Sequence, residues 1–177
     1  EDAVTLHAPA PRAVCAAPHV RPEDVTYTSF DGVEIPAFLF RPAGASAETP
    51  VPAVVYPHGG PTSYYGDEWD GHAQYFLDKG YAWLSINFRG STGYGRDYML
   101  KLRDNWGIYD VQDAKTGAEH LVREGLADGS RLVIMGGSAG GFTVLQSLCE
   151  IPGFYRAGIS MFGVANQFLL AADTHKF

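Results

Sequence analysis

Hydrophobic residues occur in short runs along the chain, and the spacing of these runs changes at about residue 50. Before that point, VTYTSF (25–30) and VEIPAFLF (33–40) flank Asp31-Gly32, a dipeptide typical of β-hairpin turns. After a polar loop (42–50), apolar runs alternate with stretches of helical spacing, as in a parallel sheet covered on both faces. The expected parallel strands are residues 51–57, 81–88, 131–135 and 157–162.

Three helices are expected between these strands. The first spans about residues 69–79, the second begins near Asp110, and the third runs over 140–150. The first helix is expected to bury Trp69, Phe76 and Leu77. The second has one apolar face, formed by Val111, Ala114, Ala118, Leu121 and Val122. The alternation predicts an α/β fold with a mostly parallel sheet and helices on both faces.

Composition narrows the class of protein. The 177 residues are 46% hydrophobic, which suits a single domain with a sizeable core. A net charge of -7 argues against nucleic acid or an anionic membrane as the main partner. No apolar run approaches the roughly 20 residues that span a bilayer. Cys15 and Cys149 form no disulfide framework, so we expect two free thiols and a cytoplasmic location.

The first 23 residues differ from the rest of the chain. They contain four prolines and show no hydrophobic period. We therefore interpret residues 1–23 as an arm or a linker from a preceding domain, and residues 24–177 as belonging to one globular domain.

A single serine stands where the third strand gives way to the third helix. Gly136-Gly137-Ser138-Ala139-Gly140 matches the G-x-S-x-G pattern, which is weak alone because 21 of the 177 residues are glycine. Its position between a strand and a helix is more specific, because a strained turn there lifts the serine hydroxyl above the sheet edge. We therefore predict that Ser138 is a catalytic nucleophile. The alternative is a small residue in a tight turn.

A second loop supplies candidates for stabilising negative charge. Acyl transfer needs two N–H donors aimed at the developing oxyanion. One comes from the residue after the nucleophile, and the other from a loop that follows an earlier strand. Ala139 and Gly60 fit these roles, the latter within His58-Gly59-Gly60-Pro61. The alternative for the second loop is a plain glycine turn.

The remaining polar residues of note are expected to have structural rather than catalytic roles. Asp110 and Asp113 resemble a helix N-cap and its third-position partner. The loop RGSTGYG (89–95) lacks the lysine of a phosphate-binding loop, so it is expected to shape the active site. Trp106 is expected to be a packing anchor. We expect no metal and no cofactor.

Five segments carry a resemblance to a known family: HGGPTS, RGSTGYGRDY, WGIYDVQDA, DGSRLVIMGGSAGGFTVL and DTHKF. In this order they resemble the catalytic domain of the prolyl oligopeptidase family, nearest its acylaminoacyl-peptidase and dipeptidyl-aminopeptidase-like branch. The resemblance implies an α/β-hydrolase fold and a serine peptidase that releases aminoacyl, acylaminoacyl or dipeptidyl units from short peptides. It also implies that residues 24–177 are the N-terminal part of the catalytic domain, and that a β-propeller precedes them.

The resemblance also assigns residue roles, position by position. Ser138 matches the nucleophile, and Gly60 and Ala139 match the backbone donors to the oxyanion. His58 stands where other branches of the family have a tyrosine that supports the oxyanion. Because histidine replaces that tyrosine here, we assign His58 a loop-shaping role.

The substrate pocket and the catalytic partners are expected after Ser138. The segment FGVANQFLL (162–170) aligns with the family's pocket wall, so Val164 and Phe168 are the expected lining residues. The base and its orienting acid should follow the serine in the chain, but only Asp173 and His175 do, two residues apart. In the family these partners come much later. We therefore expect the fold to be incomplete at its C-terminal end, and these residues alone to be inactive.

Two other functions stay open. A carboxylesterase uses the same fold, although Pro61 and the RGSTGYG loop favour a peptidase. A non-catalytic binding module is the other alternative, and a complete gene without a downstream Asp and His would indicate it. Homo-oligomerisation also stays open.

Overall fold

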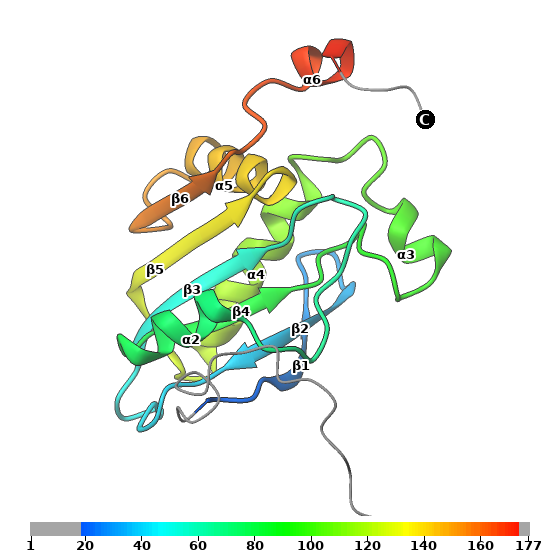
Figure 1. Ribbon diagram of the computed structural model, residues 1–177. Helices are drawn as coiled ribbons and strands as arrows, with labels where there is room; N and C mark the ends of the chain where they lie inside the picture. The colour runs from blue at the N-terminus through cyan, green and yellow to red at the C-terminus, as the bar shows by residue number, and fades with distance from the viewer. Residues whose placement is uncertain (1–18, 174–177) are drawn as a thin grey trace, which may run out of the picture.

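An antiparallel hairpin is the first element of the computed structural model, which describes residues 19–173 (Figure 1). β1 (Glu23–Thr28) pairs with β2 (Glu34–Phe40), and the Ser29 N–H donates to the Val33 carbonyl at 2.8 Å to close the loop between them. The predicted hairpin is thereby confirmed. Most of the predicted arm at residues 1–23 lies outside the described residues.

Four strands continue the sheet in parallel. They are β3 (Val51–Pro57), β4 (Ala82–Ile86), β5 (Ala127–Gly137) and β6 (Ala157–Met161). The order across the sheet is β1-β2-β4-β3-β5-β6, in which β2 is antiparallel to β4 and the later pairs are parallel. The α/β class and all four predicted parallel strands are confirmed, although β5 extends beyond residues 131–135 at both ends.

Helices cover both faces of this sheet. α2 (Gly71–Asp78) packs on one face, while α4 (Tyr109–Arg123) and α5 (Ala139–Glu150) pack on the other. Each face has its own hydrophobic core, because successive side chains of a strand point in opposite directions. Val54 of β3 belongs to the core beneath α2, and its neighbour Val55 belongs to the core beneath α4 and α5.

Two short helices complete the described structure. α3 (Arg96–Leu100) lies in the long loop after β4, and α6 (Gln167–Asp173) stands off the sheet beyond β6 (Figure 1). The spacing of apolar residues predicted neither of them. Between residues 19 and 173, no helix combines the length and the apolar character needed to cross a bilayer.

Two residues that were expected in the core lie at the surface instead. Trp69 precedes α2, whose N-cap is Asp70, and its side chain is 58% exposed. Val122, which follows the last buried residue of α4, Leu121, is 38% exposed. Helical spacing therefore predicts the middle of each helix correctly and fails at its ends, where the chain leaves the core.

Asp110 and Asp113 are buried rather than capping residues, which corrects the prediction for them. Asp110 lies inside α4, where its Oδ1 accepts from the Gly107 N–H at 2.6 Å and its Oδ2 accepts from the Thr143 hydroxyl at 2.5 Å. Burial raises the pKa of Asp110, and these two hydrogen bonds oppose the rise. Asp113 forms a buried ion pair with Arg89. Both carboxylates thus fix the start of α4 from inside the protein.

Candidate active site

Ser138 occupies a sharp turn between β5 and α5. Its backbone has φ 54° and ψ -116°, a region that non-glycine residues rarely occupy and that costs roughly 1–3 kcal/mol. The Ser138 N–H donates to the Met161 carbonyl at 3.0 Å, and the Ser138 carbonyl accepts from the Phe142 N–H at 3.0 Å, so the strained backbone is held on both sides. The residue is exposed and its hydroxyl does not cap α5. The predicted strand–turn–helix geometry is confirmed.

Glycines allow three segments to meet around this turn. A β-carbon on Gly136 would lie 2.6 Å from the Gly140 carbonyl, which is closer than side chains can approach. A β-carbon on Gly140 would collide with the carbonyl oxygen of Pro57 at the end of β3. β3, β5 and the first turn of α5 can therefore approach one another only because both residues lack a side chain.

The loop after β3 lies directly against Ser138. A β-carbon on Gly59 would be 3.6 Å from the Ser138 β-carbon. The Gly60 N–H and the Ala139 N–H donate to no acceptor among residues 19–173. Ala139 begins α5, so its N–H is one of the four that an α-helix leaves unpaired at its start. Two unpaired N–H groups are thus carried by the segments that flank the serine, as stabilisation of an oxyanion requires.

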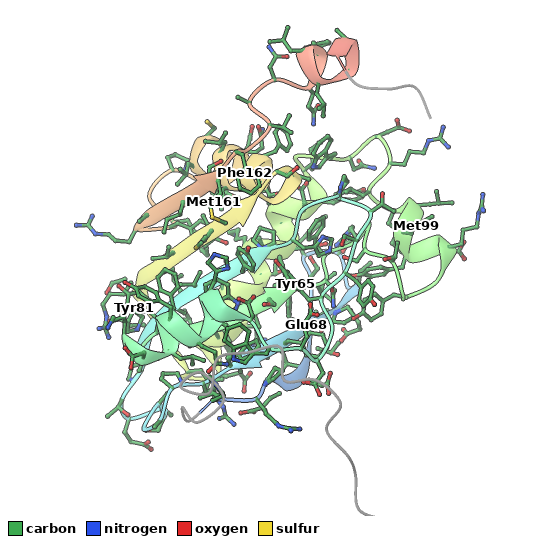
Figure 2. All side chains as sticks on the ribbon, viewed as in Figure 1. Tyr65, Glu68, Tyr81, Met99, Met161 and Phe162 are labelled. Carbon is green, nitrogen blue, oxygen red and sulfur yellow. The ribbon has the colours of Figure 1, made fainter. Side chains whose placement is uncertain are left out.

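Buried contacts tie this loop to the segment after β4. His58 is 3% exposed, and its ring contacts the rings of Phe88 and Tyr65. The Tyr65 N–H donates to Asn87 Oδ1 at 2.7 Å, and the Tyr65 carbonyl accepts from Asn87 Nδ2 at 3.0 Å. Tyr65 is labelled near the middle of Figure 2, close to the strands. Burial lowers the pKa of His58 to about 4, so its imidazole is neutral at pH 7.

The two predicted pocket residues lie in different surroundings. The Val164 N–H donates to the Ser138 carbonyl at 3.3 Å, which places Val164 beside the turn. Phe168 lies on α6 and is 89% exposed. It borders a hollow of about 360 Å³ together with Trp106 and Phe142, whose ring centroids are 4.8 Å apart.

Further apolar side chains lie near the turn without having been predicted there. Phe162 has a positive φ of 41°, and its ring carbons lie 3.0 Å and 3.1 Å from where a Gly137 β-carbon would be. Its side chain is visible at the end of β6 in Figure 2. A second hollow, of about 490 Å³, runs from Pro61 to Trp106 and the residues around α3. Phe162 is the first residue of the segment FGVANQFLL, so the match of that segment to the pocket wall could have indicated it. No sequence pattern indicated the residues around α3.

The catalytic partners of Ser138 are not visible in the described structure. No histidine among residues 19–173 bonds to the Ser138 hydroxyl. His175 lies outside the described residues, and only the backbone of Asp173 is described, as the end of α6. That these two residues do not complete a triad therefore stays a prediction. In the same part of the chain, no three His, Cys, Asp or Glu side chains gather as metal ligands would.

Most of this chain is similar in sequence to known proteins. The model of the prolyl oligopeptidase family matches residues 67–177. The acylamino-acid-releasing enzyme of Homo sapiens is 37% identical over 153 residues, which are 86% of this chain and 21% of that enzyme. Dipeptidyl aminopeptidase BIII of Pseudoxanthomonas mexicana is 32% identical over 148 residues, which are 80% of this chain and 22% of that enzyme.

Solved structures are similar to this chain over about the same share of its length as these sequences are. A puromycin-hydrolyzing peptidase of Mycobacterium tuberculosis aligns with a TM-score of 0.83 at 38% identity, over 88% of this chain and 25% of that one. The chain spans about a fifth of the length of the curated relatives it matches. The similarity therefore covers most of this chain and a small part of each relative.

Proposed function

This chain belongs to the prolyl oligopeptidase family, and from that premise we propose that the complete protein is a serine peptidase acting on short peptides. Its fold is an α/β-hydrolase fold, of which the described residues form a part. One observation carries the proposal: Ser138 is exposed in a strained turn, and its hydroxyl makes no capping hydrogen bond to α5. The names of the relatives support substrates from which aminoacyl, acylaminoacyl or dipeptidyl units are released.

The proposed reaction proceeds through an acyl-enzyme. Ser138 Oγ attacks the substrate carbonyl, its proton passes to a general base, and the carbonyl electron pair moves onto the oxygen. The N–H groups of Gly60 and Ala139 donate to that oxyanion. The carbon–nitrogen bond then breaks as the amine takes up the proton. Water hydrolyses the remaining ester and releases the acid together with free Ser138.

The base and its orienting acid are proposed to come from the part of the protein beyond residue 177. Two observations support this: no described histidine bonds to Ser138, and the curated relatives are several times longer than this chain. Residues 1–177 alone should therefore show no more than the residual catalysis of an incomplete triad, far below the whole enzyme.

Val164 and Phe168 are proposed to line the substrate pocket. The bond from the Val164 N–H to the Ser138 carbonyl supports the first assignment. The hollow that Phe168 shares with Trp106 and Phe142 supports the second. An apolar side chain of the substrate would enter this hollow.

The wider organisation is also a proposal. Residues 1–23 are proposed as the linker from a β-propeller, and residues 24–177 as the N-terminal part of the catalytic domain; the greater length of the relatives supports an additional domain.

A cytoplasmic location is supported by Cys149, a free and exposed thiol. The apolar side chains of α6 are exposed, which supports a contact between α6 and either the rest of the chain or a second copy in a homo-oligomer.

The proposal is tested on the complete protein with three p-nitroanilides, carrying an aminoacyl, an acylaminoacyl and a dipeptidyl group, and with matching p-nitrophenyl esters. Ser138→Ala serves as the blank. Ser147→Ala is the matched control, because Ser147 is buried in the same helix and its hydroxyl has no partner among the described residues.

We expect turnover of at least one p-nitroanilide in the usual enzyme range of roughly 1–10³ s⁻¹. It should be absent from Ser138→Ala and kept by Ser147→Ala. Turnover of the esters alone would replace the peptidase with a carboxylesterase. No turnover of any substrate would favour a binding module and overturn the proposal.

A further inference from the structure

The hollow of about 360 Å³ near Ser138 lies between two segments of the chain. Trp106 and Gly107, in the turn before α4, form one wall, and Phe142 of α5 belongs to the other. The Phe142 N–H donates to the Ser138 carbonyl at 3.0 Å, so this second wall is one helical turn from the candidate nucleophile. The hollow is at the lower end of the roughly 300–1,000 Å³ of ligand pockets, so the spacing of its walls decides what fits.

The two walls touch each other through apolar contacts. The ring centroids of Trp106 and Phe142 are 4.8 Å apart. Gly107 has a φ of 90°, and a β-carbon there would lie 3.1 Å from two atoms of the Phe142 ring. Apolar contacts are not directional, so they allow the rings to slide or separate. A fixed spacing needs a directional bond between the two segments.

A buried carboxylate supplies two such bonds. Asp110 is fully buried; its Oδ1 accepts from the Gly107 N–H at 2.6 Å, and its Oδ2 accepts from the Thr143 hydroxyl at 2.5 Å. Gly107 belongs to the first wall, and Thr143 directly follows Phe142 of the second. Neither Asp110 nor Thr143 borders the hollow. One carboxylate therefore joins both walls from their buried side.

The bond between Asp110 and Thr143 exists in either protonation state of the carboxyl group. The Thr143 hydroxyl has one proton and two acceptors, Oδ2 of Asp110 at 2.5 Å and the Ala139 carbonyl at 3.2 Å. With an ionised carboxylate, the proton faces Asp110, which is the nearer and the charged acceptor. With a protonated carboxyl, its O–H donates to Thr143 Oγ, and the Thr143 proton faces Ala139. Both arrangements keep α4 joined to α5.

We propose that Asp110 is a positioning residue that fixes the spacing between Trp106 and Phe142, and thereby the size of apolar side chain that the hollow near Ser138 binds. The inference rests on the proposed function, in which this hollow takes a side chain of the substrate. It adds a residue that sets substrate specificity without touching the substrate.

Loss of the carboxylate should separate the walls. In Asp110→Ala the Gly107 N–H has no acceptor among the described residues, and a buried N–H without a partner is costly. The turn before α4 therefore moves until water reaches this N–H. The Thr143 hydroxyl turns to the Ala139 carbonyl and no longer holds α5 to α4. A large apolar side chain then makes fewer contacts with the two rings and gains less from the hollow.

The turn at Ser138 should survive this change. The N–H groups of Phe142 and Val164 both donate to the Ser138 carbonyl, at 3.0 Å and 3.3 Å, and neither bond involves Asp110. The start of α4 is also held by the Asn105 carbonyl, which accepts two backbone N–H groups at 3.0 Å. The effect should therefore fall on the binding of large side chains more than on the chemistry at the serine.

The test compares two disrupting variants, two conservative variants and one control in the complete protein. Asp110→Ala removes both bonds, and Thr143→Val removes the hydroxyl at nearly constant shape. Asp110→Asn keeps both, because its amide oxygen accepts from Gly107 and its NH₂ group donates to Thr143 Oγ; Thr143→Ser keeps the hydroxyl. Tyr27→Phe is the matched control, because the buried Tyr27 hydroxyl donates to the Asp113 carbonyl of the same helix at 2.8 Å.

Two p-nitroanilides would be compared that differ only in the residue before the scissile bond, which is phenylalanine in one and alanine in the other. The measured quantity is the ratio of kcat/KM for the phenylalanine substrate to kcat/KM for the alanine substrate. A general loss of folded protein lowers both values alike and leaves this ratio unchanged. Melting temperatures of all variants accompany the kinetics.

The wild type should prefer the phenylalanine substrate. Asp110→Ala and Thr143→Val should each lower the ratio by about tenfold, since contacts of one side chain in an apolar pocket are worth roughly 10- to 200-fold. Asp110→Asn and Thr143→Ser should stay within about twofold of the wild-type ratio, and so should Tyr27→Phe even where it melts earlier.

The outcomes separate the two levels of inference. If Ser138→Ala abolishes turnover while Asp110→Ala and Thr143→Val keep the wild-type ratio within about twofold, the positioning role is wrong and the peptidase stands. A wild type without preference for phenylalanine would overturn the inference in the same way. Turnover that persists in Ser138→Ala would overturn the proposed function and the inference with it.

Two further results would also overturn the positioning role. An equal fall of the ratio in Tyr27→Phe would show a general loosening of the fold. An equal fall in Asp110→Asn would show that the charge of Asp110 matters, rather than its two hydrogen bonds. Should Asp110→Ala not fold, Thr143→Val decides the question under the same criteria.

Discussion

Nη2 of Arg89 lies 2.8 Å from Oδ1 of Asp113, and both side chains are almost completely buried. The backbone N–H and Nε of Arg89 also donate to this carboxylate, each at 3.0 Å to Oδ2. The other edge of the guanidinium binds Asp31 in the hairpin loop, and the rings of Phe30 and Tyr109 lie over it. Because Arg89 begins the RGSTGYG loop, this network anchors the loop at its base.

Arg89→Ala should destabilise the protein strongly, because it leaves the Asp113 carboxylate buried without a positive partner. Breaking such a pair costs roughly 3–5 kcal/mol. Arg41→Ala is the matched control: its pair with Glu23 is as short, at 2.6 Å, but the two side chains are 41% and 47% exposed. That change should cost less than about 1 kcal/mol. Thermal unfolding of both variants gives the comparison, and losses of equal size would argue against the anchor.

Gly60→Ala should impair catalysis more than folding. Gly60 has a φ of 123°, and a β-carbon there would lie 2.7 Å from the Thr62 nitrogen, so the loop must shift and move the Gly60 N–H. We expect kcat to fall by about 10²- to 10³-fold. Gly80→Ala is the control, because Gly80 has a φ of 79° with open space around it and should lose only roughly 1–2 kcal/mol of stability. Unchanged kcat in Gly60→Ala would remove Gly60 from the oxyanion site.

His58 should make stability depend on pH below neutrality. Its pKa is about 4 in the folded protein against 6.5 for a free histidine, because the ring is buried among Phe88, Tyr65 and Ser91, none of them charged at these pH values. The unfolded chain therefore binds a proton between pH 6.5 and 4 that the folded chain does not. The contribution is complete above pH 6.5 and is lost as pH falls towards 4, by roughly 3 kcal/mol.

This pH effect is measured as the difference between wild type and His58→Gln. Glutamine does not titrate, so the variant should lose less stability than wild type between pH 7 and pH 4. Unfolding free energies or melting temperatures at several pH values provide the measurement. Parallel curves for the two proteins would show that His58 is already protonated, or exposed, in the folded state.

The strands could be predicted from sequence because the physical requirement on them is local. A strand covered on both faces must be apolar at successive positions, as Val54 and Val55 are, and this is visible in any short window. The turn at Ser138 was equally visible, since Gly136 and Gly140 are required for the approach of the strand and the helix.

The polar networks could not be predicted in this way. Asp110 and Asp113 have the spacing of a capping pair, and only packing against the Thr143 helix and the Arg89 loop makes them buried instead. His58 and Ser91 are 33 residues apart and meet only because β3 and β4 are neighbours in the sheet. Local patterns thus locate the serine, while the groups that support its surroundings follow from the topology.

Covalent labelling by a fluorophosphonate tests the central claim, that Ser138 is the nucleophile. The complete protein and its Ser138→Ala and Ser147→Ala variants would be labelled, digested and analysed by mass spectrometry to locate the adduct. We predict one adduct, on Ser138, that is absent from Ser138→Ala and present in Ser147→Ala, because only an activated serine reacts with this reagent. Undiminished labelling of Ser138→Ala, or a complete protein that takes up no label, would contradict the claim.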